Sequence, residues 1–180
     1  MSPRSPISSR RERRCSSSLL NVTKQLWAPW RLEYITNADD QPGCVFCEAT
    51  KTTDDDGLVL YRSDVTFALL NKYPYGAGHL MIAPYRHVAE FADLTDAETL
   101  ELHRLAGAGM GALAETFTPQ GYNLGWNLGR IAGAGIVDHI HLHVVPRWAG
   151  DTNFMPVLAD VKVLPEHLEE TRRKLAAVWP

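Results

Sequence analysis

The most regular pattern in the chain is the run Asp138–Arg147, in which histidine alternates with aliphatic residues. An extended strand sends successive side chains to opposite faces, so the alternation predicts a strand with His139, His141 and His143 on one face. The aliphatic side chains between them would face a core that keeps the strand rigid. Three histidines in register favour a chemical role, whereas a single one would favour a hydrogen-bonded core residue.

Short apolar runs bounded by turn residues predict four further strands. The first two are separated by a tight Ser63-Asp64 turn, which is typical of an antiparallel hairpin. Residues 43–47 are predicted as a turn that carries two thiols, and residues 84–88 as a helical patch. The predicted strands cover residues 58–62, 65–70, 79–83 and 121–129.

Two helices complete the pattern. Thr95 and Glu98 form a capping-box start for a long helix that runs to about Thr116, and residues 165–178 predict a closing helix. Glycines within the long helix either weaken it or let it pack tightly against the sheet. Strands, a helix, strands and a helix predict an α+β domain with an antiparallel sheet of about five strands. No Walker or G-x-G-x-x-G fingerprint is present, so phosphate recognition must come from other residues.

Composition bounds the class of protein. A chain of 180 residues fits one domain, predicted here over residues 23–180 with a C-terminal extension, after a disordered Ser/Arg-rich tail at residues 1–22. The net charge of −3 argues against a nucleic-acid-binding role, and no apolar run is long enough to span a membrane. We therefore expect a soluble, cytoplasmic protein with no nucleic-acid or membrane partner. The aromatic segment 27–31 either packs on the domain or covers a ligand.

The cysteines point to a metal site or a redox pair. Cys44 and Cys47 form a C-x-x-C pair, while Cys15 lies alone in the polar tail. This number and spacing of cysteines fits a protein of a reducing compartment better than a disulfide framework. The run 54–57 is predicted as an acidic surface loop, because it lacks the full ligand spacing of a calcium loop.

The segment His139–Val145 matches the pattern His-φ-His-φ-His-φ-φ, where φ is apolar, and so resembles the histidine triad (HIT) superfamily. The resemblance spans roughly residues 26–155. Within the superfamily, the chain is similar to the bacterial branch that includes diadenosine tetraphosphate phosphorylases. It implies a HIT-like fold and a homodimer formed through the long helix and the neighbouring strand edge. The other motifs that carry it are residues 70–80, 127–129, 132–135, 27–31 and 146–148.

The resemblance implies cleavage of a purine nucleotide or dinucleotide at its α-phosphate through a nucleotidyl-histidine intermediate. His141 matches the nucleophile, and His143 would bind the phosphate and protonate the leaving oxygen. His79 would support the site by hydrogen bonding. The remaining predicted nucleotide contacts are Asn71 at a ribose hydroxyl, Asn127 at a phosphate, and the backbone N–H groups of Gly133, Ala134 and Gly135.

The chain departs from the family at Ala134 and Gly135, where many members have glutamine followed by serine or threonine. The missing side chains leave room for orthophosphate as a second anion. This favours phosphorolysis to ADP and ATP over hydrolysis that releases AMP from dinucleotides or phosphoramidates.

The resemblance also implies a structural zinc ion bound by Cys44, Cys47, His87 and His139. Two rival hypotheses remain. One is a catalytic metal held by all three triad histidines, which leaves the cysteines unexplained and lacks a carboxylate base, since Asp138 would point to the opposite face. The other is a nucleotide-binding module without enzymatic activity.

Overall fold

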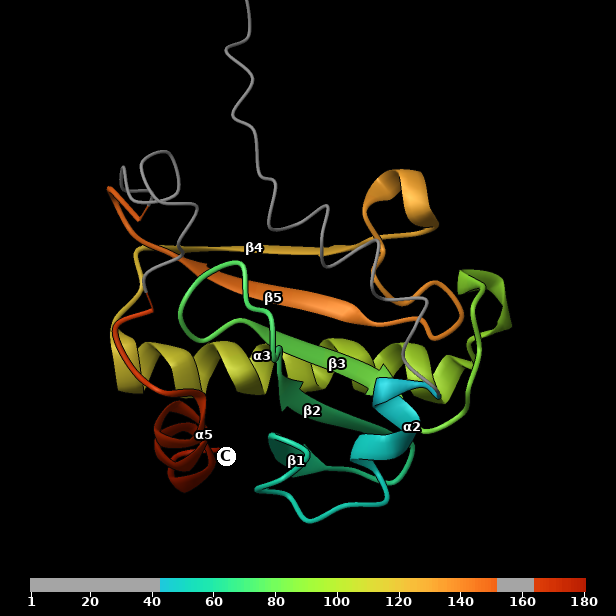
Figure 1. The fold of residues 1–180 in the computed structure, drawn as a ribbon, viewed down its shortest axis with the longest axis horizontal. Coiled ribbons are helices and arrows are strands. Elements are labelled where there is room, and N and C mark those ends of the chain that lie inside the picture. The colour runs from blue at the N-terminus through green and yellow to red at the C-terminus, as the bar shows by residue number, and fades with distance from the viewer. Residues whose placement is uncertain (1–42, 152–163) are drawn as a thin grey trace, which may run out of the picture.

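A five-stranded antiparallel sheet is the centre of the computed structural model, which describes residues 43–151 and 164–180. The strand order is β1-β2-β3-β5-β4 (Figure 1). The predicted α+β class is therefore confirmed. The predictions for residues 1–22 and for the segment 27–31 lie outside the described residues. The strands are β1 (Val59–Arg62), β2 (Thr66–Leu70), β3 (Leu80–Pro84), β4 (Gly121–Trp126) and β5 (Leu142–Arg147).

Helix α3 (Asp96–Phe117) lies along one face of the sheet, and α5 (Leu168–Ala177) packs against α3 and β1 (Figure 1). Both predicted helices are confirmed to within a few residues. The short helix α2 (Val45–Ala49) belongs to a smaller core on the other face of the sheet. Two 3-10 helices, η2 (Phe91–Asp93) and η3 (Arg130–Ala132), lie in the connections.

Alternate residues of β2 enter two different cores. Ala68 and Leu70 pack in the larger core with α3, whereas Phe67 and Leu69 pack in the smaller core with Phe46 of α2. All residues of β2 and β3 are buried, as expected for strands covered on both faces. The smaller core supports the face on which the triad histidines lie, because Phe46 also contacts two of them.

Gly109 shows why a glycine occurs within α3. A Cβ at this position would lie 2.7 Å from Leu80 Cδ1 and 3.1 Å from Trp179 Cη2, so glycine permits the close approach of α3 to β3. A Cβ at Gly107 or Gly111 would meet nothing within 4 Å, so these two glycines only weaken the helix. Both roles that the sequence left open therefore occur in α3: Gly109 permits tight packing against the sheet, and Gly107 and Gly111 weaken the helix.

The local structure differs from the prediction in three segments. The histidine segment joins the sheet only from Leu142, because the Ile140 N–H donates to Val88 O at 2.7 Å instead of continuing the ladder with β3. Residues 43–47, predicted as a turn, enter helix α2. Residues 84–88, predicted as helical, end β3 and continue as a non-helical loop.

Glu98 fixes the start of α3. Its N–H donates to Thr95 Oγ1 at 3.2 Å and its carboxylate accepts from the Thr95 N–H at 2.9 Å, which forms the predicted capping box. The carboxylate also accepts from Arg86 Nε and Nη2 at 2.8 and 2.6 Å. Hydrogen bonding from Arg86 is the main cause that lowers the pKa of Glu98 to about 2.

We expect Glu98→Gln to lower the free energy of unfolding by about 2 kcal/mol at pH 7, because it weakens a cap and removes a charge-assisted pair. The folded-state pKa lies below the ordinary value of 4.5, so this stabilisation is full above pH 4.5 and is lost as the pH falls through about 2. Urea unfolding at pH 7 and pH 2 measures the difference between wild type and variant. A difference of the same size at both pH values would contradict the charge-based explanation. Glu101→Gln, on the same helix, is the control.

Candidate active site and metal centre

His141 is buried just before β5, and its tautomer is fixed by the backbone. Its Nδ1 lies 2.8 Å from the carbonyl oxygen of His139, which can only accept, so Nδ1 carries the proton and Nε2 keeps its lone pair. Burial lowers the pKa of His141 to about 4, so the imidazole is neutral near pH 7. These are the tautomer and the charge state that a nucleophile attacking through Nε2 requires.

His143 takes its tautomer from a chain of hydrogen bonds. The Tyr75 N–H donates to His79 Nδ1 at 2.9 Å, so buried His79 is neutral with its proton on Nε2. This Nε2–H donates to His143 Nδ1 at 2.9 Å, which places the proton of neutral His143 on Nε2. His143 therefore carries an N–H donor next to the lone pair of His141.

Two aromatic residues that the sequence did not single out adjoin the triad. Phe46 lies against His141 with ring centroids 4.6 Å apart, and Tyr75 stacks on His143 at 5.6 Å. His141 and His143 meet edge to face at 4.7 Å. Tyr75 lies in residues 70–80, one of the motifs that carry the resemblance to HIT proteins, and this was the only sequence signal for it. Phe46 gave no signal, because its position depends on residues 45–49 being helical.

Asn71 and Asn127, the two predicted nucleotide contacts, form hydrogen bonds within the chain. Asn71 Oδ1 accepts from the Tyr73 N–H at 2.8 Å, and Asn71 Nδ2 lies 3.3 Å from His79 Nδ1. Asn127 Nδ2 donates to Tyr75 Oη at 3.0 Å. Both amides therefore hold loops in place, and both do so beside residues that contact His143.

The glycine-rich loop before β5 uses two of its own N–H groups. The Gly133 N–H bonds to Arg130 O at 2.9 Å, and the Ala134 N–H bonds to Gly129 O at 3.3 Å. Ala134 is also buried. In this conformation the predicted phosphate contacts at these two amides are already engaged, which leaves the Gly135 N–H as the candidate donor from this set.

The four predicted metal ligands, Cys44, Cys47, His87 and His139, converge in the structure. Their ligand atoms all lie within 4.8 Å of one another, and three sulfur-to-nitrogen distances are 3.2, 3.4 and 3.7 Å. A tetrahedral zinc site with ordinary bond lengths has S···N edges of about 3.6 Å. The four residues therefore fit a closed Cys₂His₂ zinc shell.

The two histidines of this cluster also have the outer partners usual for metal ligands. His139 Nε2 lies 2.9 Å from Pro84 O, so it carries the proton and the Nδ1 lone pair faces the sulfurs. His87 Nε2 lies 3.5 Å from Asp138 Oδ2, while its Nδ1 faces Cys47. A carbonyl or carboxylate at the far nitrogen orients a metal-binding imidazole. Asp138 was expected to point away, but the bend before β5 places it beside His87.

Burial shifts the pKa of two of these four residues before any metal binds. It raises the pKa of the Cys44 thiol to about 11 and lowers the pKa of His139. A neutral His139 is the form that binds metal. A bound dication would stabilise the Cys44 thiolate that burial disfavours, so this cysteine is better suited to binding a cation than to remaining a free thiolate.

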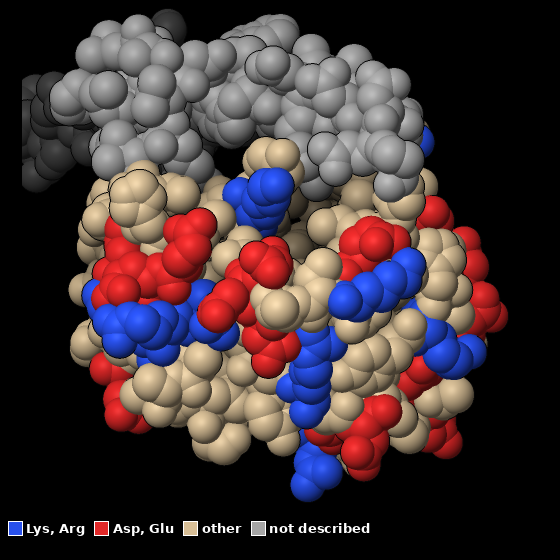
Figure 2. All heavy atoms as spheres, turned by 60° about the horizontal axis from the view of Figure 1, so that its bottom comes forward, with Lys and Arg blue, Asp and Glu red and all other residues tan. Residues whose placement is uncertain are grey.

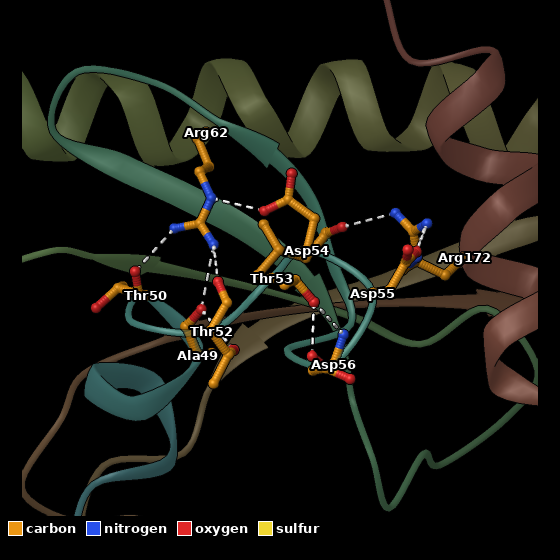
Figure 3. Close-up of polar contacts among 10 residues, drawn as sticks. Ala49, Thr50, Thr52, Thr53, Asp54, Asp55, Asp56, Arg62 and Arg172 are labelled. Carbon is orange, nitrogen blue, oxygen red and sulfur yellow. Dashed lines mark hydrogen bonds and ion pairs between the residues drawn. The ribbon is translucent and has the colours of Figure 1, made fainter.

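Helix α2, which begins after Cys44 and contains Cys47, is too short to be stable alone and is held by Arg62 of β1. The guanidinium donates to Ala49 O at 3.2 Å and to Thr50 O at 3.5 Å (Figure 3). Asp54 accepts from Arg62 Nε at 2.8 Å. Arginine at the C-terminal carbonyls of a helix satisfies exposed acceptors and complements the dipole, so Arg62 fixes the end of α2.

The acidic run 54–57 is a surface loop whose carboxylates are engaged by neighbouring side chains. Asp55 contacts Arg172 of α5, and Asp56 accepts from Thr53 Oγ1 at 2.7 Å (Figure 3). Figure 2 shows acidic and basic side chains interspersed on the face that the view presents.

Among residues 43–151 and 164–180, no helix has the length and apolar character needed to cross a membrane.

The profile of the HIT domain matches residues 52–150, which is more than half of the chain. The chain belongs to the HIT domain family. It is 41% identical over 164 residues to a Mycobacterium tuberculosis protein named AP-4-A phosphorylase, covering 87% of this chain and 84% of that one. It is 30% identical over 104 residues to an adenosine 5'-monophosphoramidase of Schizosaccharomyces pombe, covering 58% and 74% of the two chains.

Solved structures of HIT proteins share this fold. A zinc-bound histidine triad family protein from Mycobacterium smegmatis matches with a TM-score of 0.61 and 26% identity, over 76% of this chain and 93% of that one. A hypothetical histidine triad nucleotide-binding protein from Sulfolobus tokodaii matches with a TM-score of 0.61 at 23% identity, over 75% of this chain and 91% of that one. The predicted membership of the HIT superfamily is therefore confirmed.

Proposed function

We propose that this HIT protein cleaves diadenosine tetraphosphate by phosphorolysis to ADP and ATP, through an adenylyl-His141 intermediate. The observation that carries the proposal is the buried, neutral imidazole of His141, whose Nδ1–H is held by His139 O while Nε2 keeps its lone pair. The 41% identity to a protein named AP-4-A phosphorylase supports the choice of substrate and reaction.

In the first step, His141 Nε2 attacks the α-phosphorus, the bond to the bridging oxygen breaks, and ATP leaves. His143 Nε2–H donates to the phosphate or to the departing oxygen, a role that its hydrogen bond to His79 makes possible. In the second step, an oxygen of orthophosphate attacks the phosphorus of the adenylyl group. The P–N bond breaks, ADP forms, and His141 is restored.

Incubation with diadenosine tetraphosphate, with and without orthophosphate, tests this proposal. We expect ADP and ATP in equal amounts, formed only when orthophosphate is present. AMP release without orthophosphate would favour the hydrolase alternative. The similarity to an adenosine 5'-monophosphoramidase supports that alternative. If no dinucleotide or phosphoramidate reacts, the enzymatic proposal fails.

We further propose that Cys44, Cys47, His87 and His139 hold a structural zinc ion, supported by their S···N distances and by the zinc-bound relative from Mycobacterium smegmatis. When bound, zinc would cross-link α2 to the segments around His87 and His139. The rival three-histidine centre is disfavoured, because His139 directs one nitrogen to Pro84 O and the other to the cysteines.

The assembly and the compartment are also proposals. β4 is an edge strand of the sheet and exposes Leu124, which fits a homodimer built through this edge and α3. Cys44 and Cys47 are free thiols, which fits a reducing cytoplasm.

A further inference from the structure

Phe46 lies between the proposed zinc ligands and His141. It is the buried residue of α2 between the two cysteines, with no exposed surface. Its ring centroid lies 5.0 Å from that of His139 and 4.6 Å from that of His141. One side chain therefore contacts a candidate metal ligand and the candidate nucleophile at once.

The ring of His141 needs more than its hydrogen bond to be fixed. The bond from Nδ1–H to His139 O holds one nitrogen, but it leaves the ring plane free to swing about that contact. Phe46 packs on the ring with an interplanar angle of 36°, and His143 meets it edge to face at 73°. These two contacts fix the plane, and with it the direction in which Nε2 points.

We infer that Phe46 is a positioning residue, which holds the His141 imidazole in line with the α-phosphorus and links the placement of α2 to the nucleophile. The inference rests on the proposed role of His141. Phe46 itself carries no group that can take part in the reaction. Its position depends on α2, which is fixed at its C-terminal end by Arg62 and would also be fixed, through Cys44 and Cys47, by the proposed zinc ion.

The test replaces Phe46 by leucine in the zinc-loaded full-length protein. We expect Phe46→Leu to lower kcat and the single-turnover rate of His141 adenylylation roughly 10- to 100-fold, since a small misplacement of a reacting group has effects of this size. KM should change less than about twofold, and zinc content should be unchanged. Long-range ¹H–¹⁵N spectra should show the Nδ1–H tautomer of His141 in both proteins, because His139 O still holds Nδ1, so a lower rate would reflect the orientation of the ring and not a change of tautomer.

Phe67→Leu is the matched control. Phe67 is equally buried in the same small core, but it stacks on Tyr85 and not on a histidine. The same loss of aromatic volume there should reduce stability and leave the adenylylation rate unchanged. If Phe46→Leu does not fold, Phe46→Met takes its place, because the flexible, unbranched methionine side chain fills an irregular space in a core more easily than leucine does.

Three results would overturn the inference. One is an unchanged rate of His141 adenylylation in Phe46→Leu. Another is a raised KM with unchanged kcat, which would make Phe46 a wall of the nucleoside pocket. The last is a loss of rate that simply follows loss of zinc. A wild-type protein that forms no adenylyl adduct would instead contradict the proposed function, so the two failures are distinguishable.

Discussion

Replacing His141 by alanine is expected to lower the rate of diadenosine tetraphosphate phosphorolysis by about 10⁴-fold or more. The proposed reaction passes through a bond between phosphorus and His141 Nε2, and removal of a covalent nucleophile typically has an effect of this size. Alanine offers no nitrogen, and the neighbouring His143 cannot substitute because its Nε2 carries a proton and its Nδ1 accepts from His79. The measurement is kcat with saturating orthophosphate.

The intact-protein mass spectrum of a quenched reaction supplies the second readout. The wild type should gain the mass of one adenylyl group, and His141→Ala should gain none. His103→Ala is the control, because His103 lies exposed on α3 and bonds only to Thr99 O among the described contacts. A His141→Ala variant with wild-type turnover, or an adduct mapped to another residue, would refute the covalent mechanism.

The fold was predictable to the extent that its signals are local. The capping box at Thr95 and the apolar period that follows define α3 within a few residues. The continuous apolar run of β2 predicts a strand, but it cannot show which side chains face α3 and which face α2, because both faces are buried. Helix α2 is only five residues long, too short for a helical period to be visible.

The active site was predictable by residue type and only partly by geometry. Alternation placed the three histidines in one segment, and the resemblance to HIT proteins assigned their roles and named His87 as a metal ligand. The tautomers of His139, His141 and His143 depend on Pro84 O, on His139 O and on a relay from the Tyr75 N–H. Backbone atoms carry no sequence signature, so these relations appear only in three dimensions.

Replacing Cys44 by serine is expected to lower zinc affinity by more than about 100-fold. Loss of a residue that only hydrogen-bonds to a metal ligand typically lowers affinity 10- to 100-fold, and Cys44 is itself a proposed ligand, so its loss should have a larger effect. Cys44 precedes α2, and its sulfur lies 3.2 Å from His139 Nδ1, so it joins the two segments that a zinc ion would cross-link. With zinc in excess, a 100-fold weaker site lowers the free energy of unfolding by about 2.7 kcal/mol. Competition with a chromophoric chelator and thermal unfolding measure the two effects.

Cys15→Ser makes the same chemical change in the remaining cysteine and should leave zinc content and stability unaltered. His141→Ala completes the comparison, since it should retain zinc while losing turnover. The opposite pattern, with metal kept in Cys44→Ser and lost in His141→Ala, would establish the three-histidine centre and remove the structural role proposed for the cysteine pair. His139 belongs to both candidate centres, so a variant of His139 would lose metal under either, whereas Cys44 and His141 each belong to one centre and therefore separate them.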